Sequence, residues 1–360
     1  MCGRATSPST ERSSVAAGRN MSSSSTTRFL LYVLWTPILA GFPGTLAQNN
    51  PPATAPTRRE LRKGAGADDL KGQILVNGTT RTYLLYVPQS ITRNHPAPLL
   101  LVFHGGGGHN YNMPRFTGFD RLAESRGFIV AYPESANTHW NDTRALSRAD
   151  DVGFVRALIA ELERSYPVDP ARVYATGISN GGFFSQRVAC DLSPQIAAVA
   201  SVAATMPETL VPVCHPSNSI SVLFMQGTND PLVHIEGGNV ARTHGRNISL
   251  ADACHFWIDH NQTAKKADSS DLPSHDSNGT SVHRDIYAGG KQDTEVVAYT
   301  IRGGGHTWPG GPQYFPAVLV GKTNHDINAS EVIWEFFSRH ARQECSVNPA
   351  VCNPIDQPTM

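Results

Sequence analysis

The chain has 360 residues, and its 30 Lys and Arg balance 30 Asp and Glu, so the formal net charge is zero. Because phosphate binding depends on clustered basic side chains, this balance argues against a nucleic-acid partner, and it provides no electrostatic attraction to an anionic membrane. Charged residues make up only 17% of the chain, and 31 Gly and 25 Pro exceed average usage, which indicates a loop-rich globular protein.

The N-terminal 47 residues have the three-part pattern of a secretory signal peptide. Arg28 precedes an apolar run over 29–35, and Thr45-Leu46-Ala47 supplies the small residues of a cleavage site. We expect cleavage after Ala47 and a secreted, extracellular protein, with Met21 as an alternative start. A membrane anchor is the alternative reading, but prolines interrupt the apolar run well before the roughly 20 residues that a spanning helix needs. We therefore expect no stable membrane partner after cleavage.

Domain boundaries follow from composition. Residues 48–71 contain prolines and charges without a core pattern, which predicts a flexible linker. One domain is expected over 72–342, followed by a short cysteine-containing tail over 343–360. No internal repeat and no second apolar block indicate a further domain, and no oligomeric state is predicted.

Apolar periodicity predicts strands that alternate with helices. The predicted strands cover 73–76, 81–87, 98–103, 128–132, 173–176, 197–203, 221–226 and 296–301. The predicted helices cover 119–125, 151–165 and 180–189. Asn77-Gly78 between the first two strands is typical of a hairpin turn. Strands separated by helices imply right-handed crossovers, so we predict a doubly wound α/β fold with a mostly parallel sheet and helices on both faces.

The cysteines are compatible with export. Cys2 would be removed with the signal peptide, and an odd number of thiols remains, so one is free or paired in some other way. The best assignment is two disulfides and one free thiol: Cys190–Cys214, Cys345–Cys352 and Cys254. The spacing permits these pairs without proving them. A metal site is the alternative, but no Cys-x-x-Cys or His-Glu-x-x-His pattern occurs, so no metal is expected.

Six Asn-x-Ser/Thr sequons follow the signal peptide. They would carry glycans only in a glycosylating secretory route, and otherwise we expect them to be polar surface. They lie at Asn77, Asn141, Asn247, Asn261, Asn278 and Asn328.

The sharpest chemical motif is Gly177-Ile178-Ser179-Asn180-Gly181, which lies directly between a predicted strand and a predicted helix. A strand that feeds straight into a helix forces Ser179 into a strained turn, and the flanking glycines remove side chains that would collide there. The helix N-terminus favours negative charge that develops beside the hydroxyl. A Ser in an ordinary Gly-rich turn is the alternative, but the strand and helix favour a nucleophile.

A nucleophilic serine needs a base and an acid that orients the base. Asp230 follows the predicted strand over 221–226, at the end of a strand where α/β sites are built, although a turn-capping Asp before Pro is the alternative. His306 lies in a Gly-rich loop after the strand over 296–301 and has a side chain suited to proton transfer near neutral pH. The order Ser179, Asp230, His306 is that of α/β hydrolases.

The loop His104–Gly108 completes the predicted site. It follows the strand over 98–103 and matches an HGGG-type oxyanion loop, so Gly105 or Gly106 should supply one N–H and Asn180 the other. His104 is expected to support the loop and not to transfer protons. A phosphate-binding loop is a weaker reading, because no Lys-Ser/Thr follows.

Beyond these single motifs, the chain resembles the secreted polyhydroxybutyrate depolymerase/feruloyl esterase family of α/β hydrolases over about residues 72–342. The resemblance rests on segments that recur in order: His104–Gly108, Trp140, Asp150–Phe154, Gly177–Gly182, Gly227–Pro231 and Gly304–Gly310. It implies the α/β-hydrolase fold, Ser179 as nucleophile, Asp230 as acid and His306 as base. It also suggests that Trp140 and Trp308 lie near the mouth of the site and bind substrate, with core packing as the alternative.

Two departures from the family narrow the expected substrate. Depolymerases often carry Cys-Thr-Gln after the His-Gly, whereas this chain has only glycines, which is closer to the feruloyl esterase-like branch. No polymer-binding module follows the domain. Soluble or plant-wall aryl esters therefore fit better than a solid polymer.

The expected reaction is hydrolysis of a small-molecule or polymeric carboxylic ester through an acyl-enzyme, without a cofactor. Two alternatives remain from the sequence. A serine peptidase on the same fold is chemically possible, although it usually needs an additional domain. A non-catalytic secreted binding protein would normally have lost part of the triad.

Overall fold

The computed structural model describes residues 70–241 and 244–343. The predicted signal peptide, most of the predicted linker and nearly all of the tail, with the expected Cys345–Cys352 disulfide, lie outside the described residues. The first strand already begins at Leu70, inside the segment expected to be linker.

An antiparallel hairpin opens the domain. Strand β1 (Leu70–Val76) pairs with β2 (Thr79–Tyr86), and both turn residues, Asn77 and Gly78, have positive φ angles of 49° and 77°. Asn and Gly are the residues that most readily adopt this geometry. The predicted hairpin is therefore confirmed.

A parallel core forms the centre of the sheet. Its strands are β3 (Ala97–Phe103), β4 (Ile129–Pro133), β5 (Val168–Ile178), β6 (Ala198–Val202), β7 (Ser221–Gly227) and β12 (Val296–Arg302). They lie in the order β4-β3-β5-β6-β7-β12 and pair in parallel throughout. Strands β3, β4, β6 and β7 are buried along their whole length, as apolar runs covered on both faces should be.

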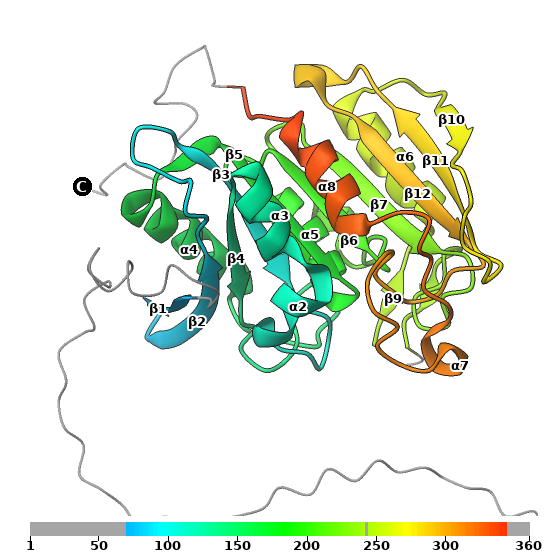
Figure 1. Cartoon of the computed structure of the whole chain (residues 1–360), viewed down its shortest axis with the longest axis horizontal. Helices are drawn as coiled ribbons and strands as arrows, with labels where there is room; N and C mark the ends of the chain where they lie inside the picture. Colours follow the sequence, from blue (N-terminus) through cyan, green and yellow to red (C-terminus); the bar gives the residue numbers. More distant parts are fainter. Residues whose placement is uncertain (1–69, 242–243, 344–360) are drawn as a thin grey trace, which may run out of the picture. The chain divides into compact units, whose positions relative to one another are not determined.

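Antiparallel strands extend the sheet at both edges (Figure 1). The β1–β2 hairpin joins β4 at one edge, whereas β11 (Ser281–Tyr287) and β10 (Asp268–Asp271) follow β12 at the other. No strand is predicted between residues 232 and 295, so this second extension is not among the predicted elements. The strand β10 consists only of Asp and Ser, which gives no apolar signal.

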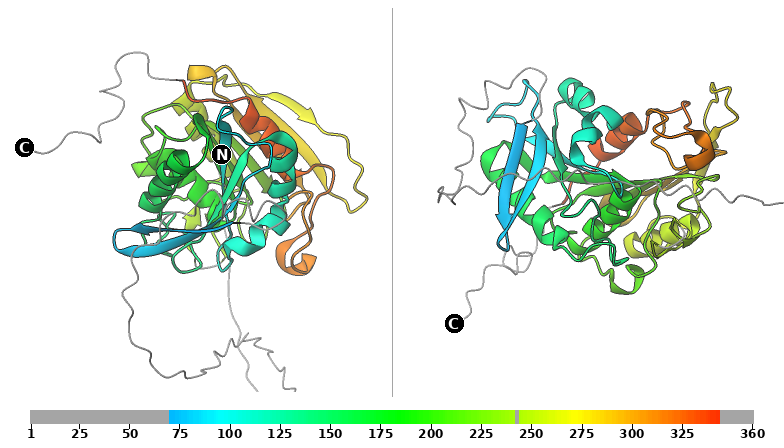
Figure 2. Two further views of the ribbon diagram at one scale, coloured as in Figure 1. Left: turned by 60° about the vertical axis from the view of Figure 1, so that its left-hand side comes forward. Right: turned by 90° about the horizontal axis from the view of Figure 1, so that it is seen from below.

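Helices cover both faces of the sheet, as the right-hand view of Figure 2 shows. One face carries α2 (Met113–Thr117), α3 (Phe119–Arg126) and α8 (Ala329–Ser338), and the other carries α4 (Asp151–Ser165), α5 (Asn180–Asp191) and α6 (Leu250–Asn261). Each layer packs in its own large apolar cluster against the sheet. The predicted doubly wound α/β fold is confirmed.

Shorter elements lie in the connections between these helices and strands. They are the single turns η1 (Asn110–Asn112), η2 (Val211–Val213) and η3 (Lys291–Asp293), the short helix α7 (Ala317–Val320), and the two-stranded ribbon of β8 (Gly238–Asn239) with β9 (Arg246–Asn247). Of these, α7 matters for the site, because it lies between the loop of His306 and α8.

The Asp-Asp-Val-Gly-Phe segment has a structural explanation. Asp150 caps α4 by accepting a hydrogen bond from Gly153 N–H, and a Cβ on Gly153 would overlap the Asp150 carboxylate. Asp151 is buried and pairs with Arg81 at 2.6 Å, and the Arg81 guanidinium lies over the Phe154 ring. Burial raises the pKa of Asp151, and the bond from Asn141 N–H and the Arg81 charge oppose that rise. The segment thus fixes the loop before α4.

The cysteine predictions divide into tested and untested parts. A disulfide joins Cys190 at the end of α5 to Cys214 after η2, which confirms that pair. Cys254 is free and buried on α6, and burial raises the pKa of its thiol to about 12.

The sequons are not all polar surface. Asn261 and Asn247 are buried, and their side-chain amides bond to main-chain groups of Ile220 and Ile248. The folded domain therefore leaves no room for a glycan at either asparagine.

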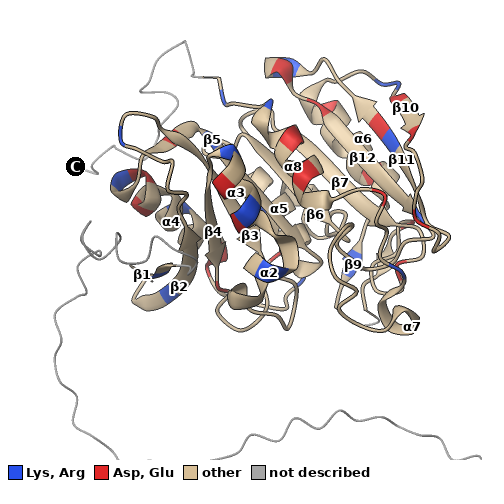
Figure 3. Ribbon diagram, viewed as in Figure 1, with Lys and Arg blue, Asp and Glu red and all other residues tan. Residues whose placement is uncertain are grey.

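Basic and acidic residues, which are equal in number in the chain, are both spread over the domain (Figure 3). In the view of Figure 3, acidic and basic residues alternate over the helices and strands without a large area of one sign. Among the described residues, no helix is both long enough and apolar enough to cross a membrane.

Candidate active site

Ser179 occupies a strained turn between β5 and α5. Its φ and ψ are 57° and −121°, a conformation that is costly for a residue with a side chain. The turn is possible because Gly177 and Gly181 let three backbones meet: a Cβ on Gly181 would lie 2.4 Å from the carbonyl oxygen of Phe103. Ser179 N–H bonds to Val202 O at 2.9 Å, which fixes the turn against the end of β6.

Asp230 and His306 form a buried pair. His306 Nδ1 lies 2.8 Å from Asp230 Oδ2, and both residues are 3% exposed. Asp230 Oδ1 accepts the N–H groups of Leu232 and Val233, and Oδ2 also accepts Gln226 Nε2. The carboxylate is thus held by four donors, so its direction toward the imidazole is fixed.

The loops that carry the pair are tied together. Thr228 N–H and Asn229 N–H, just before Asp230, bond to the carbonyl oxygens of Ile301 and Gly304. His306 N–H bonds to Val320 O at the end of α7, and a Cβ on Gly305 would overlap that same carbonyl oxygen. Glycine is therefore required beside His306 for close approach to α7.

Tyr314 holds the base from outside the triad. Its hydroxyl donates to His306 O at 2.7 Å. Burial raises the pKa of the Tyr314 phenol, and the negative charge of Asp230 adds to the rise. The phenol therefore stays protonated and remains a donor at neutral pH.

The predicted oxyanion loop lies against the serine turn. An ideal Cβ on Gly105 would contact Cβ of Ser179 at 3.6 Å, and one on Gly106 would contact Cβ of Asn180 at 3.5 Å. These contacts bring Gly105, Gly106 and Asn180 together, as expected for an oxyanion hole. Asn180 is the first residue of α5, so its main-chain N–H has no acceptor within the helix.

His104 supports this loop. Its Nδ1 is 2.8 Å from Gly105 O, and its Nε2 accepts Ser135 N–H. Burial lowers the pKa of the imidazole, and the bond to Gly105 only partly opposes that effect. Each ring nitrogen of His104 therefore has a hydrogen-bond partner, and the neutral imidazole has a structural role in the loop.

Sheet topology explains why the three triad candidates share one region. Strands β5, β7 and β12 run parallel, so Ser179, Asp230 and His306 all follow the carboxyl ends of strands at the same edge of the sheet. Within the described residues, Ser179 Oγ makes no hydrogen bond to His306. Such bonds often tighten only when substrate is present.

Comparison with known proteins decides the family. No family model matches the chain. The protein named "Putative esterase NocK" of Nocardia uniformis subsp. tsuyamanensis is 32% identical over 313 residues, which cover 79% of this chain and 90% of that protein. The chain belongs to the esterase family of α/β hydrolases.

The names of further similar proteins also indicate that this chain is an ester-hydrolysing enzyme. Feruloyl esterase B of Piromyces equi is 30% identical over 232 residues, covering 63% of this esterase but only 42% of that protein. Among solved structures, an acetyl xylan esterase from Aspergillus awamori superposes with a TM-score of 0.51 at 14% identity, covering 75% of this chain and 99% of that chain. The structural likeness establishes the α/β-hydrolase fold alone.

Both tryptophans expected near the site are buried. Trp140 is fully buried, stacks on Phe184 at 4.9 Å and donates to His104 O, whereas Trp308 is 1% exposed and donates to Ser330 Oγ. Their burial favours the core-packing alternative, although Trp140 N–H also bonds to Asn180 Oδ1 beside the oxyanion candidates, and contact with substrate stays a prediction. Both sit in the apolar layers that cover the sheet, because their rings complete those layers while their N–H groups find buried acceptors.

Sequence reasoning missed the residues that hold the triad and oxyanion candidates of this esterase. Gln226 bonds to Asp230 and Tyr314 to His306, whereas Asp142 bonds to Asn180 and Arg144 pairs with Asp142. No motif marks them: Gln226, Tyr314 and Arg144 contact residues within eight positions of themselves, and Asp142 reaches Asn180 from 38 positions away. His139 also borders the oxyanion loop, since a Cβ on Gly106 would lie 3.0 Å from its ring.

Proposed function

We propose that this esterase is a secreted serine carboxylesterase in which Ser179 is the nucleophile, His306 the general base and Asp230 the acid that orients it. The observation that carries the proposal is the buried His306–Asp230 pair beyond the ends of β7 and β12, at the same sheet edge as the strained Ser179. In this arrangement His306 Nδ1–H donates to Asp230, which leaves Nε2 free to face the serine hydroxyl.

Each proposed residue has a defined chemical step. Ser179 Oγ attacks the ester carbonyl while His306 takes its proton, and the resulting imidazolium is stabilised by Asp230. Main-chain N–H groups of the Gly105–Gly106 loop and of Asn180 stabilise the negative oxygen. His306 then protonates the leaving alcohol, and water releases the acyl group by the reverse sequence. No cofactor takes part in these steps.

For the substrate, we propose an uncharged ester of the plant cell wall, with a feruloyl or acetyl group as the acyl part. The relatives named feruloyl esterase support this choice, as does the absence of Cys-Thr-Gln after His104-Gly105. A polyhydroxybutyrate polymer is the second candidate from the family resemblance. A panel of methyl ferulate, acetylated xylan, 4-nitrophenyl acyl esters, polyhydroxybutyrate and a peptide anilide separates these from a peptidase.

Secretion and domain limits belong to the same proposal. The Cys190–Cys214 disulfide fits an oxidising compartment, and residues 1–47 have the signal-peptide pattern. Expression of the full chain with N-terminal sequencing of the exported product tests both points. A mature protein that begins at residue 48 is the expected result, and an uncleaved intracellular product would contradict it.

The deciding experiment replaces Ser179 with Ala. We expect 4-nitrophenyl butyrate hydrolysis to fall by at least about 10³-fold with unchanged thermal unfolding, because the acyl-enzyme can no longer form. Ser185→Ala is the matched control, since this buried serine lies in the helix that follows Ser179 and its hydroxyl bonds to Gly181 O. Full turnover by Ser179→Ala would refute the proposal.

A further inference from the structure

We propose that Asp142 and Arg144 are positioning residues that hold Asn180, and thereby its main-chain N–H, in place for the oxyanion. The inference rests on the proposed function, because it assigns the support of one of its oxyanion donors. Both residues lie in the loop between β4 and α4, outside the motifs that define the triad.

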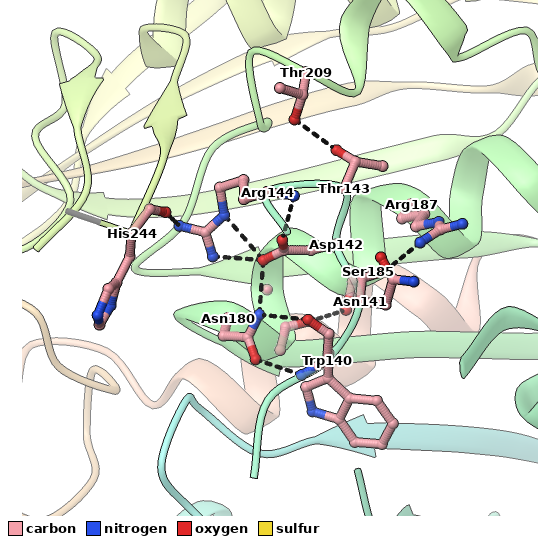
Figure 4. Close-up of polar contacts among 12 residues, drawn as sticks. Trp140, Asn141, Asp142, Thr143, Arg144, Asn180, Ser185, Arg187, Thr209 and His244 are labelled. Carbon is pink, nitrogen blue, oxygen red and sulfur yellow. Dashed lines mark hydrogen bonds and ion pairs between the residues drawn. The ribbon is translucent and has the colours of Figure 1, made fainter. Parts of the chain in front are cut away.

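The side chain of Asn180 is clamped on every side (Figure 4). Its Oδ1 accepts Trp140 N–H at 2.7 Å, and its Nδ2 donates to Trp140 O at 3.1 Å and to Asp142 Oδ2 at 2.7 Å. An asparagine that only began a helix would cap it or face solvent. Here the amide instead connects the first residue of α5 to the loop before α4.

Asp142 is the charged member of this clamp. Its carboxylate is fully buried, and besides the Asn180 amide it accepts hydrogen bonds from Arg144 Nε and Nη2 at 3.0 and 2.5 Å. A buried carboxylate is costly unless it is paired and hydrogen-bonded, and Arg144 supplies the pairing. The ion pair therefore lets a charged acceptor, which is stronger than a neutral one, bind the Asn180 amide.

Arg144 is fixed in turn by contacts on its other sides. Arg144 Nη1 donates a hydrogen bond to His244 O at 3.1 Å, and the guanidinium carbon lies 4.0 Å from the centre of the Phe183 ring on α5. The clamp thus reaches from the β8–β9 ribbon to the first turn of the helix that follows Ser179. Figure 4 shows Arg144 between His244 and Asp142, with Asn180 beyond.

The backbone of the loop is distorted where it makes these contacts. Thr138, Thr143 and Ala145 have positive φ angles of 63°, 80° and 66°. For a β-branched residue such as Thr143 this conformation is unfavourable, and it persists only where surrounding contacts determine it. At Thr143 it places Arg144 N–H on Asp142 Oδ1, which closes the ion pair within three residues.

The chemical reason for such a clamp lies in the oxyanion hole. A donor stabilises the transition state only when its direction is set before the charge develops. The N–H of Asn180 is at the unbonded start of a helix, directly after a strained residue, where small rotations are cheap. Fixing the side chain of Asn180 restricts those rotations without placing any group in the path of the substrate.

The first test removes both members of the ion pair together, so that no unpaired charge is left in the interior. Asp142→Leu together with Arg144→Met replaces the buried ion pair by apolar side chains, a change that is often neutral for stability. We expect the midpoint of thermal unfolding to stay near that of the parent, while kcat for 4-nitrophenyl butyrate falls by about tenfold to a hundredfold with little change in KM. A folded double variant with parental kcat would overturn the inference.

Asp142→Asn decides the matter if that double variant does not fold. The change keeps the size of the side chain but also leaves the buried Arg144 without its counter-charge, so thermal unfolding should occur at a lower temperature. In the folded protein the weaker acceptor for the Asn180 amide should lower kcat about fivefold. An arylboronic acid, which forms a tetrahedral adduct with a serine nucleophile, should bind more weakly by the same factor. Parental kcat and parental boronate affinity in this variant would overturn the inference.

A double-mutant cycle tests whether Asp142 acts through Asn180. Asn180→Ala keeps the main-chain N–H but removes the clamped amide, so adding Asp142→Asn to it should cause no further loss in kcat. Independent, multiplicative losses would contradict the inference. Glu295→Gln is the matched control, because Glu295 also pairs with an arginine, Arg339, but lies at the amino end of β12.

The same series separates this inference from the function on which it rests. If Ser179→Ala is inactive while the Asp142 variants keep parental kcat, only the role of the clamp fails. If Ser179→Ala keeps full turnover, the proposed function fails as well.

Discussion

Asp230 shows how a single side chain is fixed before any substrate is present. Two main-chain N–H groups, Gln226 and His306 occupy its two oxygens, so rotation of the carboxylate would break several bonds at once. Such a residue can stabilise an imidazolium without reorganising, which is the source of most of its effect on rate.

Asp230→Asn therefore tests charge separately from shape. An asparagine can still accept the N–H groups of Leu232 and Val233, so the fold should be retained. The lost charge and the changed imidazole tautomer should lower kcat by about 10³- to 10⁴-fold. Asp169→Asn, at an ion pair with Arg172 on the strand before Ser179, is the control. A loss below tenfold in Asp230→Asn would show that another acid orients His306.

His104 makes stability depend on pH. Burial lowers the pKa of the folded imidazole below the roughly 6.5 of an unfolded histidine, so below that pH the unfolded chain binds the additional proton first. The contribution is present above pH 6.5 and is lost as pH falls toward the folded pKa. Urea unfolding at pH 7.5 and 5.5 should show this loss. The loss of unfolding free energy between these two pH values should be smaller in His104→Gln than in His95→Gln, which alters an exposed histidine.

At the residue scale, motifs located the three triad candidates but not what holds them. Ser179 and His306 lie in Gly-rich segments whose spacing is visible in the sequence. Gln226 and Tyr314 lie in no such segment, and their contacts with Asp230 and His306 depend on how the chain turns back on itself within four to eight residues. For Trp140 and Trp308 the family resemblance suggested a place near the mouth of the site, with core packing as the alternative, and their burial with bonded N–H groups favours core packing.

Among the helices and strands, α5 begins at the oxyanion candidate Asn180 and ends beside a disulfide. Cys190 in its last turn is linked to Cys214, and the loop closed by the bond spans 24 residues of sequence. The chain-entropy argument gives such a loop about 3.5 kcal/mol of stabilisation, because the bond restricts the unfolded chain.

Replacing both cysteines by serine should lower the thermal midpoint by several degrees while leaving kcat at 25 °C near the parental value. The change lies at the opposite end of α5 from Ser179, so the nucleophile turn should not move. A dithiothreitol titration of the parent, followed by calorimetry, checks the same quantity without a mutation. Cys254→Ser alone serves as a control for the loss of a thiol. Equal midpoints with and without the disulfide would contradict this expectation.

Among the elements, long apolar runs and amphipathic periods were sufficient to predict the parallel core. Helix α4 was predicted with the bounds it has, because Asp150 marks its start and the apolar spacing continues to Leu162. The edge strands β10 and β11 were missed for a physical reason. Partly exposed strands need fewer apolar residues, and their identity comes from pairing with β12.

At the scale of the whole molecule, residues near both ends of the described range make contacts with the domain. Leu70 pairs with Leu85 in the first hairpin, and Arg342 N–H bonds to Ala171 O at the start of β5. Both contacts involve residues close to the predicted limits of 72 and 342, which remain a prediction.

A chain of residues 70–343 should therefore fold and hydrolyse 4-nitrophenyl butyrate with the kcat/KM of the full chain. Its matched comparison is residues 78–343, which lacks β1 and exposes the edge of β2. We expect this shorter chain to have a lower thermal midpoint or to aggregate. Loss of activity in 70–343 at an unchanged midpoint would show that the flanking segments contribute to catalysis.

The outermost strand β10 has a consequence for behaviour in concentrated solution. An edge strand offers unpaired N–H and C=O groups, on which a second molecule could add a strand. Here Asp268 and Asp271 stand at its two ends, and the hydrogen bond from His283 lowers the pKa of Asp271. Charged side chains on an edge strand oppose the addition of a second strand, so this edge, with an exposed Asp268 and an Asp271 held by His283 and Arg302, also discourages the molecules from assembling into fibrils.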